Sequence, residues 1–143
     1  MPKSDFQEKP KRTSRTLAWV LVIIWAALIF ILSSIPGSAY PSHPEPLNVV
    51  AHSVLYFVLA VLLTRALSFS KMPFWKVALL AIVIVSLYGA SDELHQLFVA
   101  GRSSDPFDWA VDTIAAAVGA IVTILFLSAR IVSRSRKRDG TKP

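Results

Sequence analysis

Four apolar segments, each long enough to cross a lipid bilayer, constrain the fold of this chain more than any other feature. They lie at about residues 17–35, 47–67, 74–99 and 106–132. A helix needs about 20 apolar residues to span the hydrocarbon core, because each residue advances it by about 1.5 Å. The chain is 17% charged, whereas soluble domains carry about 25% charge. We therefore predict an all-α fold, an integral membrane bundle of four transmembrane helices that forms one domain over residues 17–132.

The first apolar segment follows a basic stretch, as the apolar core of a signal peptide also does. It is longer than the 7–15 residues typical of such a core, and no A-x-A-like cleavage site follows it. We predict an uncleaved helix instead. Residues 1–16 and 133–143 are rich in lysine and arginine, and we expect disordered basic tails there. The absence of cysteine excludes disulfides and thiol chemistry.

Lysine and arginine lie almost entirely on one side of the predicted membrane. Of the 15 such residues, only Arg102 falls in a loop on the opposite side. Basic residues near helix ends accumulate on the cytoplasmic side of a membrane, so we predict that both termini are cytoplasmic. Basic ends of this kind also attract anionic lipid. We therefore expect membrane lipids as partners, and no nucleic acid.

A polar run from Tyr88 to Asp112 interrupts the apolar background. An ionisable side chain at the centre of a bilayer costs roughly 2.5–3.5 kcal/mol on insertion scales, so such residues need either a function or a structural network. Counted from the predicted outer helix ends, His52, Asp92 and Asp112 all lie about 8–10 Å below the outer surface. Three helices therefore present ionisable groups in one layer.

Helical spacing assigns the polar residues to shared faces, because residues three or four apart are neighbours on a helix. The stripes are Asn48, His52 and Tyr56 in the second segment, Tyr88, Asp92, His95 and Gln96 in the third, and Asp108 and Asp112 in the fourth. We expect the three stripes to face the interior of the bundle. Ala115, Ala116 and Gly119 extend the fourth stripe as a seam for close helix approach.

Several of these residues also have a structural interpretation. Asp105 and Asp108 suit capping of the fourth helix, which we expect to begin at Pro106. Arg102 suits an interfacial anchor, an ion-pair partner for an acid of the third helix, or a contact to substrate. The two histidines suit hydrogen-bonded structural roles as well as acid–base chemistry. The remaining aromatic candidates suit packing or the membrane interface: Tyr56, Tyr88, Trp75 and Trp109.

Three motifs carry a resemblance to known proteins: S-D-E-L-H-Q-L-F-V-A-G-R-S, then D-W-A-V-D-T-I-A-A-A-V-G, preceded by H-x-x-x-Y in the second segment. Together they resemble the VanZ-like membrane protein family, over about Asn48 to Gly119. That family is named for a component of a glycopeptide-resistance cluster and is associated with reduced sensitivity to teicoplanin. The resemblance implies a multi-pass protein of the bacterial cytoplasmic (inner) membrane. The matching positions are His52, Tyr56, Asp92, Glu93, His95, Gln96, Gly101, Arg102, Asp108, Thr113 and Gly119.

The chain departs from the family pattern at two places. The pattern commonly has Asp-Lys where this chain has Asn48 and Val49, and Asn where this chain has Asp112. The polar layer therefore lacks one cation and gains one carboxylate. A substrate contact through that lysine is not available here, and teicoplanin resistance as the role of this member stays open.

Three classes of function fit the polar layer: an enzyme acting on a lipid-linked envelope precursor, a protein that binds or shields such a precursor or a glycopeptide, and a transporter. As an enzyme, its catalytic candidates are His52, Asp92, Glu93, His95 and Asp112, whose residue types suit acid–base work. Its substrate-binding candidates are Arg102, Gln96, Tyr56, Tyr88 and Asp108. An arginine near a helix N-terminus suits a phosphate or pyrophosphate. A divalent metal on His95, Asp92 and Asp112 is conceivable, but the spacing matches no recognised metal motif. We assign no metal, and we assign neither a cofactor nor an oligomeric state.

Overall fold

The computed structural model describes residues 12–39 and 45–139, which contain four α-helices and one short 3-10 helix. The elements are α1 (Arg12–Ser33), η1 (Gly37–Ala39), α2 (Glu45–Leu67), α3 (Phe74–Gln96) and α4 (Pro106–Asp139). All four α-helices are long and apolar enough to cross a membrane. The predicted four-helix, all-α membrane bundle is confirmed.

Three helix boundaries differ from the prediction by three residues or more. Residues 12–16 and 133–139, predicted as tails, are helical, because arginine and lysine favour helix and let it continue past the apolar segment. α3 ends at Gln96 rather than near residue 99, and the chain closes into a tighter turn in which the Phe98 amide donates to the His95 carbonyl at 3.0 Å. Residues 1–11, 40–44 and 140–143, and the side chain of Asn48, lie outside the described part of the chain.

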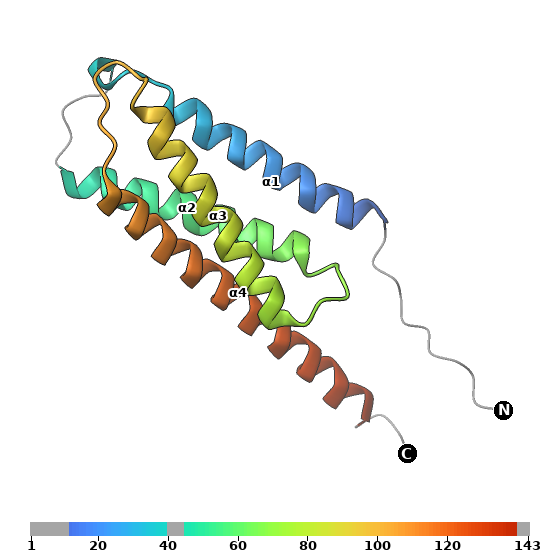
Figure 1. Ribbon diagram of the computed structural model, residues 1–143. Coiled ribbons are helices and arrows are strands. Elements are labelled where there is room, and N and C mark those ends of the chain that lie inside the picture. Colours follow the sequence, from blue (N-terminus) through green and yellow to red (C-terminus); the bar gives the residue numbers. More distant parts are fainter. Residues whose placement is uncertain (1–11, 40–44, 140–143) are drawn as a thin grey trace.

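α2 makes the most extensive helix contacts in the bundle, and it packs against α4, α1 and α3. Figure 1 shows two distinct ends. At one, which we call the clasp end, η1 lies beside the connection between α3 and α4 (residues 97–105). At the other, which we call the basic end, lie the start of α1, the α2–α3 connection (residues 68–73) and the end of α4.

Small residues bring α2 and α4 together, and this is the most extensive helix contact in the bundle. Ala60, Ala116 and Ala120 are fully buried. A Cβ atom on Gly119 would lie 2.6 Å from the carbonyl oxygen of Phe57, so only glycine permits this approach. The predicted seam therefore lies in this contact, and it brings the polar residues of α2 and α4 within reach of each other.

Candidate functional site

The first turn of α4 sets the direction of the polar residues that follow it. Asp105 caps the helix, because its Oδ1 accepts a hydrogen bond from the Phe107 amide at 2.8 Å. Pro106 occupies the first helical position, where its missing N–H costs nothing. The helix start is as predicted, and it places Asp112 one and a half turns into α4, on the face toward α2.

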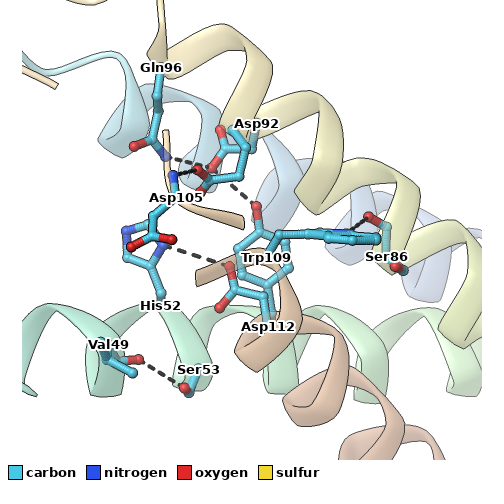
Figure 2. A network of polar contacts seen from close by, with 11 residues as sticks. Val49, His52, Ser53, Ser86, Asp92, Gln96, Asp105, Trp109 and Asp112 are labelled. Atoms are coloured by element: carbon cyan, nitrogen blue, oxygen red, sulfur yellow. Dashed lines mark hydrogen bonds and ion pairs between the residues drawn. The ribbon is translucent and has the colours of Figure 1, made fainter. Parts of the chain in front are cut away.

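His52 and Asp112 form an ion pair between α2 and α4. The Nδ1 atom of His52 lies 3.7 Å from Oδ2 of Asp112, an ion-pair distance and longer than a hydrogen bond. The two partners differ in exposure: the His52 side chain is 21% exposed and that of Asp112 is 3% exposed. In Figure 2 the His52 ring, from α2, faces the Asp112 carboxylate, from α4. A partly exposed imidazole is thus held against a buried carboxylate.

Asp92 is held between α2 and α3 by neutral groups. Its Oδ2 atom accepts hydrogen bonds from the Tyr56 hydroxyl at 3.1 Å and from Gln96 Nε2 at 3.3 Å. All three side chains are buried, and Asp92 itself is 4% exposed. Figure 2 shows Gln96 turned toward Asp92 from one helical turn further along α3. These two groups of contacts define what we call the polar cluster: His52, Tyr56, Asp92, Gln96 and Asp112.

Some buried polar atoms of the polar cluster have no hydrogen-bond partner. They include Oδ1 of Asp92, Oδ1 of Asp112 and Nδ1 of His52. A buried polar atom without a partner costs about 1–3 kcal/mol, and more when the group is charged. Native proteins accept such a cost chiefly at sites that exchange protons or bind a ligand or water. The cluster is therefore a candidate site rather than a saturated structural network.

Glu93 lies beside the polar cluster but points to the α3–α4 connection. Its Oε2 atom accepts a hydrogen bond from the Asp105 amide at 2.8 Å, and its side chain is buried. Asp108 is close enough to interact electrostatically with Glu93, His52 and Asp112. Glu93 thus anchors the loop that leads into α4, which is a structural task whatever else it does.

The polar atoms of His95 and Tyr88 contact α1, contrary to the prediction that the whole stripe faces one shared interior. The Tyr88 ring also lies 6.3 Å from the ring of Tyr56 in α2. Nε2 of His95 lies 3.0 Å from the Ser34 hydroxyl, and the ring packs 4.7 Å from Phe30. Because Ser34 already donates to the Phe30 carbonyl, His95 is the donor in this contact. The Tyr88 hydroxyl donates to the carbonyl of Ala26 at 2.7 Å.

Arg102 also contacts α1. Its Nε and one terminal nitrogen donate to the carbonyls of Ile35 and Leu32, at 3.3 and 3.4 Å. Leu32 lies in the last turn of α1 and Ile35 lies just after it, and the Leu32 carbonyl also accepts from the Ile35 amide at 3.3 Å. A cation at this end of the helix suits the helix dipole. The guanidinium caps the C-terminal end of α1.

Sequence reasoning missed two residues that complete this end of the bundle. Ser34 contacts His95, and the serine pair that closes the first apolar segment is a usable signal for it. Gly37 donates its amide to the carbonyl of Ala100 at 3.0 Å and so joins η1 to the α3–α4 connection. Nothing in the sequence indicates which loop a glycine of this kind will meet.

Proton exchange and anion recognition are the chemistry that these side chains offer. The polar cluster supplies an imidazole, two carboxylates, a phenol and an amide within one layer. Among the residues that the structure describes, no group of three or more histidine, aspartate or glutamate side chains is arranged to hold a metal ion. The imidazole, the carboxylates and the phenol of the polar cluster are the side-chain types that exchange protons.

Four membrane-length helices with apolar outer faces and ionisable groups buried near one end define an integral membrane protein with an internal polar site. Large apolar side chains such as Ile23, Leu87 and Leu125 are 64–66% exposed, as suits a surface covered by lipid. The chain belongs to the VanZ/LLP1 family, whose family model matches residues 18–127. This confirms the resemblance seen in the motifs. No curated protein and no solved structure matches the chain.

Proposed function

We propose that this VanZ-like membrane protein acts at the outer side of the bacterial cytoplasmic membrane on a lipid-linked precursor of the cell envelope. In this proposal His52 exchanges a proton with the substrate, and Asp112 orients the imidazole and stabilises its charged form. The single observation that carries the proposal is the His52–Asp112 pair, in which the histidine reaches the surface and the carboxylate is buried.

The pair has the geometry that acid–base work needs. Its Nδ1 faces Asp112, which leaves Nε2 as the nitrogen that can meet a substrate. A carboxylate on the far side of an imidazole fixes the ring orientation and favours the imidazolium that forms during proton transfer. Asp92 adds a second buried carboxylate with an unpartnered oxygen. Asp112 stands where the family pattern commonly has Asn, so this pair is a feature of the present chain.

The proposed orientation rests on the distribution of basic residues. Every lysine and arginine in the part of the chain that the structure describes, except Arg102, belongs to a segment at or near the basic end. The positive-inside rule assigns that end to the cytoplasm. The clasp end and the polar cluster near it would then face outward, where a lipid-linked precursor of the wall is exposed.

Arg102 is the candidate for holding a phosphate of that precursor. It lies at the clasp end, is half-buried, and makes two long contacts to carbonyls of α1. A phosphate would offer it a charged, two-pronged acceptor in place of neutral ones. Gln96, Tyr56 and Asp108 complete the proposed substrate contacts from the polar cluster and its rim.

A second candidate function is supported by the contacts that lie outside the polar cluster. Glu93 holds a loop amide, His95 holds Ser34, and Arg102 holds the end of α1. The polar groups of these three side chains find hydrogen-bond partners within the chain, as in a structural scaffold. They favour a non-enzymatic protein whose outer loops bind or shield an envelope precursor or a glycopeptide and so alter teicoplanin sensitivity.

The test separates the two functions by replacing each member of the pair with an uncharged amide of similar size. His52→Gln and Asp112→Asn keep side-chain size and remove proton exchange and charge. We expect both to accumulate in the membrane at normal levels and to lose most of the protein's effect on sensitivity to envelope-directed antibiotics, teicoplanin among them. Ser86→Ala is the matched control, because it removes a hydrogen bond to Thr113 between α3 and α4 outside the cluster.

An intact phenotype in His52→Gln at normal abundance would favour the non-enzymatic binding function over the enzyme. An intact phenotype in Asp112→Asn alone would show that the histidine works without a charged partner, and it would remove Asp112 from the proposed chemistry.

A further inference from the structure

A shallow groove of about 340 Å³ lies on the surface of α3 near the basic end of the bundle. It is lined by Trp75, Lys76, Leu79, Leu80 and Val83. Its apolar residues are well exposed, with Trp75 at 64% and Leu79 at 55%. The groove lies within the membrane-length segment Phe74–Gln96, so in a bilayer it faces lipid rather than water.

The groove combines an apolar track with a cation at one end. Trp75, Leu79 and Val83 are spaced four residues apart, so they form a stripe about 12 Å long along α3. Lys76 belongs to the first turn, and its Nζ lies 5.3 Å from the centre of the Trp75 ring. A lysine placed over an aromatic ring near a helix end is typical of the interface between lipid headgroups and hydrocarbon.

We propose that this groove binds one anionic phospholipid, with the headgroup phosphate at Lys76 and an acyl chain along Trp75, Leu79 and Val83. The apolar stripe fits a hydrocarbon chain, and the lysine supplies the charge that a phosphate with an anionic headgroup requires. The groove therefore offers charge to a phosphate at one end and apolar surface to a hydrocarbon chain along the rest of its length. The site is independent of the chemistry proposed for the polar cluster.

Quenching of Trp75 by brominated lipid measures this binding directly. The full-length protein is reconstituted into phosphatidylcholine bilayers that contain either brominated phosphatidylglycerol or brominated phosphatidylcholine. The Trp75 signal is the difference between each protein and the same protein carrying Trp75→Phe. One lysine near an anionic surface favours binding by about 1 kcal/mol, or about fivefold. We expect brominated phosphatidylglycerol to bind about fivefold more tightly than brominated phosphatidylcholine.

Three variants assign that preference to the groove. Lys76→Gln should abolish it, and Lys76→Arg should retain it. Arg130→Gln is the matched control, since it removes a cation that lies 4.3 Å from the Phe126 ring on another helix, and it should leave the preference unchanged.

Equal binding of the two lipids by the unmodified protein would overturn the proposal. A preference that survives in Lys76→Gln, or that falls equally in Arg130→Gln, would also overturn it, because either result indicates diffuse attraction to the surface. If both lipids quench Trp75 less as the protein density in the bilayer rises, a second copy of the chain covers this face instead of a lipid, and the proposal is overturned.

Discussion

The backbone of Gly37 in η1 lies directly against the backbone of Gly101 in the α3–α4 connection. A Cβ atom built on Gly37 would overlap the carbonyl oxygen and carbon of Gly101. Gly101 in turn has φ of 72°, a left-handed conformation that favours glycine. Two glycines from loops far apart in sequence therefore close the clasp end of the bundle.

Replacing Gly37 with alanine should open this contact. The new methyl group meets backbone, which cannot rotate away, and overpacking of this kind costs about 1–3 kcal/mol. We expect a lower thermal unfolding midpoint for purified Gly37→Ala in detergent. Ser38→Ala, at the next and exposed position, should unfold like the unmodified protein. Equal midpoints for the two variants would mean that the clasp does not form.

Glu93 offers a way to separate structure from chemistry. Glu93→Gln keeps an oxygen that can accept a hydrogen bond from the Asp105 amide. Glu93→Ala removes this acceptor and should lower the free energy of unfolding by about 0.5–1.5 kcal/mol. If Glu93 only anchors the loop, Glu93→Gln should match the unmodified protein in both thermal unfolding and antibiotic sensitivity, and Glu93→Ala should unfold earlier. Loss of the phenotype in Glu93→Gln at unchanged stability would instead place this carboxylate among the reacting groups.

Arg102 is tested by substitutions that keep or remove its charge. Lysine can still cap the carbonyls of α1, so Arg102→Lys should accumulate normally. It lacks the planar fork that grips a phosphate, and we expect it to lose most of the antibiotic phenotype. Arg102→Ala should reduce membrane abundance as well, because the end of α1 loses its cap. A full phenotype in Arg102→Lys at normal abundance would exclude the phosphate clamp.

Topology can be measured without any assumption about activity. Because every lysine and arginine that the structure describes, except Arg102, belongs to a segment at or near the basic end, we expect both termini in the cytoplasm. A reporter fused after Pro143 should give a cytoplasmic signal, and one inserted after Ser38 should give an external signal. The reverse pair of signals would invert the bundle and place the polar cluster in the inner half of the membrane.

The sequence predicts the helices and much of the polar cluster because both follow from local rules. Apolar length locates the four helices, and Asp105 followed by Pro106 marks the start of α4. His52 and Asp112 lie at similar depths below the outer ends of their helices, as counted from the sequence, and in the structure they form an ion pair. These features need no knowledge of how the loops fold.

The division of α3 between two neighbours could not be predicted at this level. Tyr88 and His95 lie seven residues apart and point within about 20° of each other, whereas Asp92 and Gln96 lie further round the helix by roughly 40–100°. The sequence groups all four as one stripe. The position of α1 decides that the first pair faces α1 and the second faces the polar cluster. That position depends on long-range packing.

The guanidinium of Arg102 has a thermodynamic consequence for any anion that binds it. Two of its donors are engaged by the carbonyls of Leu32 and Ile35, so an anion that takes these two donors removes the contribution of Arg102 to the cap of α1. Binding of an anion at Arg102 and release of the end of α1 are then linked. The free energy that the cap contributes to the folded state is subtracted from the free energy of anion binding. The same linkage runs in reverse: a mutation that loosens α1 from the bundle should tighten anion binding.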